Sequence, residues 1–135
     1  MRSIIRFVAA AMILATTFTS VAQAACTQAQ LAGVWKAYSA GVDTGVSYWT
    51  SCLIVINSVG VIAPTTCVNS FNFFGQLQGR VVLTRGNLCE YNGWFTFASA
   101  TNYLRNMTLA RDNNTAAGVG VFTGGSFIFT MTRIN

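Results

Sequence analysis

Short runs of alternating apolar and polar residues recur along the chain, and turn-forming residues separate them. The run from Ser126 to Ile134 shows this pattern most clearly. One of its faces carries Phe127, Phe129, Met131 and Arg133. A period of two residues is that of a β-strand with one buried face. Since no segment after the first two dozen residues has the length and period of a long helix, the sequence predicts an all-β fold.

The number and spacing of these runs predict how the strands are arranged. We count eight or nine short strand-like runs between Gly33 and Ile134. This spacing is typical of an antiparallel up-and-down β-barrel of about eight strands, with a β-sandwich as the alternative. Thr27 and Gln30 fit a capping box, so a short helical turn is expected before the first strand.

Glycine and proline residues mark the expected interruptions of the strands. Ser39–Gly45 is predicted to be a loop, and Gly75–Gly79 a turn, because each contains two glycines. Asn57–Gly60 is predicted to be a tight turn between two strands. Pro64 is expected to end the short strand Val61–Ala63 or to lie at a sheet edge, because proline lacks the amide hydrogen of a strand.

The run Val46–Ile56 is apolar on both faces. One face carries Val46, Tyr48, Cys52, Ile54 and Ile56, and the other carries Trp49, Leu53 and Val55. The sequence leaves open which face points inward. A barrel strand needs one apolar face, so we expect the other to meet a second subunit or a covering loop such as Ser39–Gly45.

Residues 1–24 have the features of a secretory signal peptide. Two arginines precede an apolar run that starts at Phe7, and Ala22 and Ala24 supply the small residues that a signal peptidase requires. The apolar run is shorter than the ~20 residues of a membrane-spanning helix. We therefore expect a secreted or periplasmic protein with no stable membrane insertion after cleavage, in which residues 25–135 form a single disulfide-linked β-barrel domain.

The four cysteines are Cys26, Cys52, Cys67 and Cys89. An even number of cysteines in an exported chain predicts two disulfides, and four cysteines allow three pairings. We favour Cys52 with Cys67, because the turn Asn57–Gly60 folds their strands back on each other, and this leaves Cys26 to pair with Cys89. A metal site is disfavoured, since the sequence contains no histidine and no Cys-x-x-Cys spacing.

Charged residues are few and are spread along the chain. Residues 25–135 contain six basic and three acidic side chains, a net charge of +3. Nucleic-acid-binding proteins typically have clustered lysine and arginine residues. Because the basic residues of this chain are not clustered, no nucleic-acid partner is expected. The chain lacks histidine and its three acids lie far apart, so we expect no enzymatic activity and no cofactor. Glu90 is expected to pair with Arg80 or Arg85 on a neighbouring strand.

Gly33-x-Trp35, entered from a short helical turn, and Arg133 on the last strand resemble the signature of the calycins, the superfamily of avidins and lipocalins. The resemblance implies an up-and-down barrel in which Arg133 packs across Trp35 and closes one end. It also implies a non-enzymatic binding role. Avidins have an asparagine and an aspartate after this motif that help to hold biotin, whereas residues 36–38 are Lys-Ala-Tyr, so the resemblance does not extend to biotin binding.

Five aromatic residues are candidates for a ligand site or an interface: Tyr48, Trp49, Tyr91, Trp94 and Phe95. Apolar pockets in barrel mouths use such residues, although an eight-stranded barrel has room for at most one small ligand. We therefore hypothesise an exported protein that binds a small apolar or aromatic ligand. The alternative is a protein-binding or self-assembling module, such as an exported enzyme inhibitor. Trp49 and Trp94 lie on the strand faces opposite to the cysteines, so they face outward if the cysteines face the core. Exposed aromatic side chains of this kind are typical of a homo-oligomer interface.

Overall fold

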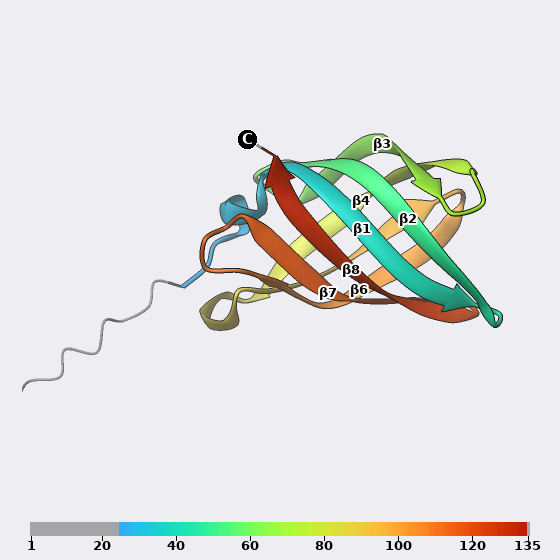
Figure 1. The fold of residues 1–135 in the computed structure, drawn as a ribbon. Helices are drawn as coiled ribbons and strands as arrows, with labels where there is room; N and C mark the ends of the chain where they lie inside the picture. The colour runs from blue at the N-terminus through green and yellow to red at the C-terminus, as the bar shows by residue number, and fades with distance from the viewer. Residues whose placement is uncertain (1–24, 135) are drawn as a thin grey trace, which may run out of the picture.

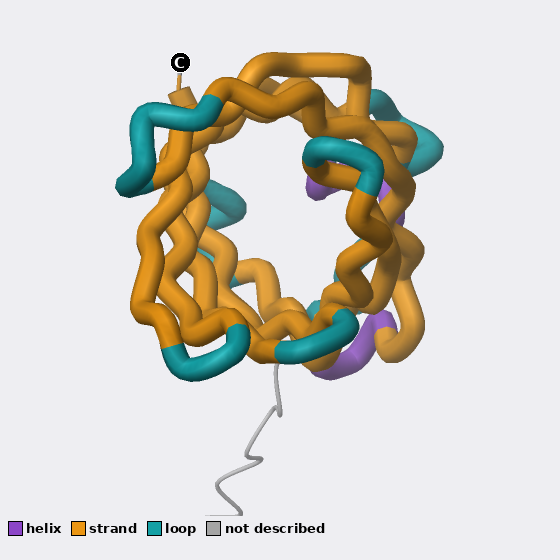
Figure 2. Tube along the Cα trace, turned by 90° about the vertical axis from the view of Figure 1, so that its right-hand side faces the viewer, coloured by secondary structure: helices purple, strands orange, loops and turns teal. Residues whose placement is uncertain are grey.

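The computed structural model describes residues 25–134, which form a closed barrel of eight antiparallel strands (Figure 1, Figure 2). Each strand pairs with the next in sequence, and β1 also pairs with β8, so the sheet has no free edge. The strands are β1 (Gly33–Asp43), β2 (Val46–Ile56), β3 (Val61–Asn69), β4 (Phe74–Arg85), β5 (Glu90–Phe97), β6 (Ala100–Leu109), β7 (Thr115–Phe122) and β8 (Gly125–Ile134). The predicted barrel is confirmed, and the sandwich alternative is wrong. The predicted signal peptide lies outside the described residues.

Two short 3-10 turns complete the fold: η1 (Gln28–Leu31) before β1 and η2 (Gly86–Leu88) between β4 and β5. They gather at one end of the barrel with the turns β2–β3 and β6–β7 (Figure 1). We call this the closed end. The connections β1–β2, β3–β4, β5–β6 and β7–β8 surround the opposite end, the mouth, which faces the viewer in Figure 2.

The strands alternate between buried inward and exposed outward side chains. In β8, Phe127, Phe129 and Met131 are buried, as the sequence predicts. In β2, Cys52 and Ile54 are buried and face inward. The opposite face of β2, which carries Trp49, Leu53 and Val55, is exposed on the outside of the barrel.

The predicted loop over Ser39–Gly45 is wrong for Ser39–Asp43, and Thr44 and Gly45 alone form the turn between β1 and β2. Strand β1 continues to Asp43 and pairs without a break with both β2 and β8. Small residues are needed here, because a Cβ atom on Gly41 would lie 2.9 Å from the Tyr48 hydroxyl and 2.8 Å from the Cβ of Phe127. Since this segment is a strand, it is also not the covering loop expected over Trp49.

The predicted turn over Gly75–Gly79 is likewise wrong, because both glycines lie within β4. A Cβ atom on Gly75 would lie 2.6 Å from the Phe97 ring, and one on Gly79 would lie 2.6 Å from the Cα of Phe95. The glycines therefore allow a close approach of the neighbouring strand rather than a reversal of the chain.

Pro64 does not end β3, which continues to Asn69. The proline lies where the register between β3 and β4 shifts, between Ile62 and Thr65. Such an irregularity accommodates a residue without an amide hydrogen. The Thr65 hydroxyl donates a hydrogen bond of 2.6 Å to the Leu53 carbonyl, which links the shifted segment to β2.

Two disulfides are present, Cys26–Cys89 and Cys52–Cys67, the pairs that the sequence analysis favours. Cys52 and Cys67 are direct partners in the register of β2 and β3. Cys26–Cys89 connects the N-terminal segment to the residue after η2. The Cys26 amide also donates a hydrogen bond of 2.8 Å to the Gly86 carbonyl.

The closed end is filled by Trp35, whose side chain is fully buried. Its indole Nε1–H donates a hydrogen bond of 3.0 Å to the Leu31 carbonyl in η1. The guanidinium carbon of Arg133 lies 4.4 Å from the centre of a Trp35 ring. Gly33 makes room for this contact, because a Cβ atom there would collide with the guanidinium group and because its φ of +148° favours glycine.

Hydrogen bonds attach η1 and the residues before it to the strands. The Gln28 side chain donates a hydrogen bond of 3.1 Å to the Val81 carbonyl and accepts one of 2.6 Å from the Leu83 amide. The Tyr91 hydroxyl donates a hydrogen bond of 2.9 Å to the Thr27 carbonyl. The N-terminal segment is thus a plug with polar contacts to β4 and β5 on one side.

Candidate ligand-binding site

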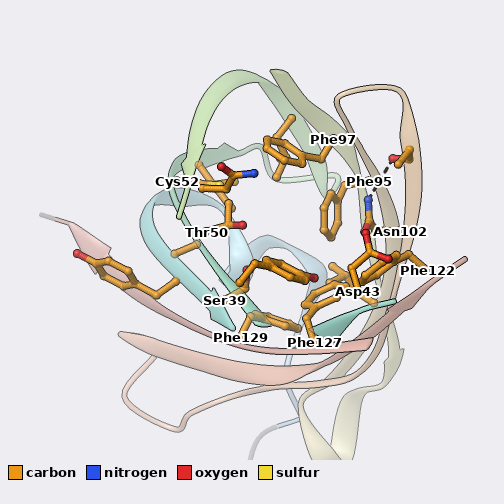
Figure 3. Close-up of a pocket in the computed structure, with 18 of the residues that line it drawn as sticks. Ser39, Asp43, Thr50, Cys52, Phe95, Phe97, Asn102, Phe122, Phe127 and Phe129 are labelled. Carbon is orange, nitrogen blue, oxygen red and sulfur yellow. Dashed lines mark hydrogen bonds between the residues drawn. The ribbon is translucent and has the colours of Figure 1, made fainter. Parts of the chain in front are cut away.

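The barrel interior contains a cavity of about 560 Å³ that extends to the mouth (Figure 3). Its deeper part is lined by aliphatic residues, among them Ile54, Ile62, Val81, Leu104 and Met131. Aromatic rings line the part nearer the mouth: Tyr48, Phe95, Phe97, Phe122, Phe127 and Phe129. This volume lies within the 300–1,000 Å³ of typical small-molecule sites.

The cavity exists because the large inward rings lie over glycines of neighbouring strands. A Cβ atom on Gly118 would lie 2.9 Å from the Phe129 ring, and one on Gly120 would collide with the Phe127 ring. The rings therefore lie against the barrel wall and leave the centre open. The interior of an eight-stranded barrel is just wide enough to be filled by side chains or to hold one small ligand.

A few polar groups lie among the apolar residues near the mouth. Asp43, Asn102, Ser39 and Thr50 all line the cavity (Figure 3). Asn102 is buried, and its side-chain NH2 group donates a hydrogen bond of 3.1 Å to the Ala100 carbonyl. Among residues 25–134, no hydrogen bond reaches its side-chain oxygen, which leaves an acceptor at the cavity wall.

Tyr48 combines an aromatic face with a polar group at the mouth. Its ring packs edge-to-face against Phe122 with 6.2 Å between centroids. Burial, and secondarily the negative charge of Asp43, raise the pKa of the Tyr48 hydroxyl above its ordinary value. The hydroxyl therefore stays protonated at neutral pH and can donate a hydrogen bond to a ligand.

The five aromatic residues singled out from the sequence lie in three places. Tyr48 and Phe95 line the cavity. Tyr91 is fully buried at the closed end and contacts the plug instead. Trp49 and Trp94 lie on the outer surface, 50% and 45% exposed. Only two of the five are thus positioned to contact a ligand in the cavity.

Several cavity residues are not evident from the sequence pattern. Asp43 falls in a segment predicted to be a loop. It lies an even number of residues from Trp35 on the same strand, so its side chain is on the same inward face. Phe127 and Phe129 were assigned correctly to one strand face but were not recognised as cavity residues. Asn102 carried no local signal, because its position depends on the pairing of β6 with β5 and β7.

The remaining charged groups lie away from the cavity. The described residues contain one ion pair, in which Arg85 Nε lies 3.5 Å from a Glu90 carboxylate oxygen. This is one of the two pairings expected for Glu90. Within residues 25–134, acidic residues and cysteines form no group of three or more that could hold a metal ion. Nor does this part of the chain include a helix with the length and apolar character needed to cross a membrane.

Comparison with known proteins adds no family assignment. No protein-family model matches the chain, and a search of the curated proteins gives no match. The resemblance to calycins that Gly33, Trp35 and Arg133 indicate therefore stays a prediction.

Proposed function

We propose that this protein is an exported, non-enzymatic binding protein that holds one small apolar or aromatic ligand inside the barrel. The observation that carries the proposal is the cavity of about 560 Å³, closed by the plug at one end and lined by aromatic and aliphatic side chains. Burial of an apolar ligand in such a site is favourable by roughly 25 cal/mol per Å² of surface removed from water. A calycin-like role in ligand binding agrees with this proposal by analogy of fold.

The composition of the cavity supports binding over catalysis. Among its lining residues, Asp43 carries the one carboxylate, and no histidine, lysine or second acid stands near it. General acid–base catalysis commonly needs a pair of groups with complementary protonation states. The polar groups present are sufficient to orient a ligand.

Export is proposed from the features of residues 1–24, and the two disulfides agree with it. Disulfides form and persist in oxidising compartments such as the periplasm or the extracellular space. A secreted or periplasmic binding protein would meet its ligand there.

The neutral fluorescent probe phenylnaphthylamine should bind with a 1:1 ratio and with increased fluorescence. Ser39→Trp should weaken this binding by about tenfold or more, because the indole would project into the cavity and compete for the same volume. The measurement is a fluorescence titration on oxidised protein that contains residues 25–135.

Ser126→Trp is the matched control, since Ser126 is exposed on the outer face of β8. It should leave the affinity unchanged. No saturable binding to the parent protein would refute the cavity function, and an equal loss of affinity in both variants would show that Ser39 does not report on the cavity.

Self-assembly is the second candidate function, and one outer stripe favours it. Trp49, Ala40, Ile128 and Val119 are successive partners across β2, β1, β8 and β7. Their side chains face outward, with Ile128 64% and Val119 42% exposed. A contiguous apolar stripe of this kind is typical of a contact between proteins.

We expect the protein to form a dimer at micromolar concentrations, and Trp49→Lys to shift it to the monomer. Trp94→Lys is the matched control, because Trp94 is similarly exposed but pairs with Arg80 and Tyr103 outside the stripe. Light scattering coupled to size exclusion measures the mass. A monomeric parent protein, or equal effects of both substitutions, would contradict assembly through the stripe.

A further inference from the structure

We propose that the cavity selects ligands that carry a positively charged amine on an apolar or aromatic body, with Asp43 receiving the amine at the mouth. This inference rests on the proposed ligand-binding function. Its starting observation is that Asp43 is the only charged residue among those that line the cavity.

The backbone directs the Asp43 carboxylate toward the mouth. Asp43 is the last residue of β1, and its partner in β8 is Gly125, which has no side chain to cover it. A Cβ atom on Gly124 would lie 3.1 Å from Asp43 Oδ1, so the carboxylate lies beside the β7–β8 turn. Figure 3 shows it at the cavity wall among Asn102, Phe122 and Phe127.

No cation of the described chain neutralises Asp43. The one ion pair among residues 25–134, Arg85–Glu90, lies at the closed end, and Arg133 is engaged there with the plug. Lys36 lies outside the cavity, over the Tyr38 ring at 5.4 Å. An unpaired carboxylate beside low-dielectric walls concentrates negative potential at the mouth. A ligand cation would therefore find an unoccupied counter-charge.

Neighbouring groups complete a site suited to an ammonium. Gly125, the partner of Asp43, pairs with Phe122, and Phe122 pairs with Asn102, so these residues form one row across the barrel. The faces of Phe122 and Tyr48 attract cations. The side-chain oxygen of Asn102 can accept a hydrogen bond from the ammonium. A carboxylate ligand would find no positive partner among the lining residues.

Three ligands with the same naphthalene body test the inference: naphthylethylamine, naphthylethanol and naphthylacetate. Isothermal titration calorimetry at neutral pH and low salt should show that the amine binds about five- to tenfold more tightly than the alcohol, with the acid weakest. Asp43→Asn should remove this preference, because the amine would lose its counter-charge and should bind no more tightly than the alcohol. Asp112→Asn, in the β6–β7 turn at the closed end, is the matched control and should keep the preference.

The outcomes separate this inference from the proposed function. If phenylnaphthylamine and all three ligands fail to bind, the cavity function itself fails. If phenylnaphthylamine binds but the amine has no advantage, only the inference on Asp43 fails. The same conclusion follows if Asp43→Asn keeps the preference. Salt provides a second measurement that needs no variant, since added salt should weaken binding of the amine but not of the alcohol.

Discussion

Replacing Arg133 by alanine should lower the melting temperature of the barrel by about 10 °C or more. The guanidinium group donates hydrogen bonds to the carbonyls of Gln30, Ala32 and Asn113. It also lies over Trp35. A hydrogen bond from a charged donor contributes about 1.5–3 kcal/mol, and truncation leaves its acceptors without partners. Because two of these acceptors lie at the plug, its contact with the barrel should loosen.

Arg105→Ala is the matched control for this experiment. Arg105 lies 5.8 Å over the Tyr103 ring on the outer surface, where its side chain is exposed. Its removal should change the stability by less than about 0.5 kcal/mol. Circular dichroism on heating measures both variants. An unchanged melting temperature for Arg133→Ala would mean that Arg133 does not close the barrel, and equal shifts in both variants would show a general effect of arginine loss.

The strands could be predicted wherever the alternation of apolar and polar side chains alone shows which face of the strand is buried. The last strand is predicted in this way, and the turn Asn57–Gly60 is predicted from its turn-forming residues. The choice of inward face in Val46–Ile56 could not be made from the sequence, because both faces are apolar. Closure of the barrel decides it, since the face with Cys52 meets the core while that with Trp49 remains outside.

Glycine was the main source of wrong predictions. Ser39–Gly45 and Gly75–Gly79 were assigned to a loop and a turn, because glycine is typical of chain reversals. In the barrel Gly41, Gly75 and Gly79 lie close to atoms of a neighbouring strand, such as the Phe97 ring next to Gly75, whereas Gly45 does lie in a turn. That requirement arises between strands distant in sequence, so a local rule does not detect it.

The candidate site was predictable only in part for the same reason. The aromatic content indicated an apolar interior, but the open volume depends on pairs such as Gly118 with Phe129. Asp43 could have been recognised, since its parity with Trp35 continues through β1. The expectation of a loop hid that signal, and with it the one charge that lines the cavity.

The double variant Cys26→Ser/Cys89→Ser should be less stable than the oxidised parent by about 4 kcal/mol, from the entropy of the loop that the bond closes. This disulfide spans 63 residues, whereas Cys52–Cys67 spans 15, for which the same relation gives about 3 kcal/mol. The variant also frees the residue that begins the plug. Denaturant unfolding of the two double variants measures the difference.

The two variants should also differ in how they affect the cavity. Cys52 lines the cavity, but its strand stays in register with β1 through an unbroken ladder, so Cys52→Ser/Cys67→Ser should keep the cavity closed at its far end. Loss of Cys26–Cys89 should weaken the attachment of η1, whose Leu31 is fully buried in the core. Proteolysis should therefore cleave the N-terminal segment faster only in Cys26→Ser/Cys89→Ser. Free thiols in the folded parent protein, or equal cleavage rates in parent and variant, would contradict this role of the disulfide.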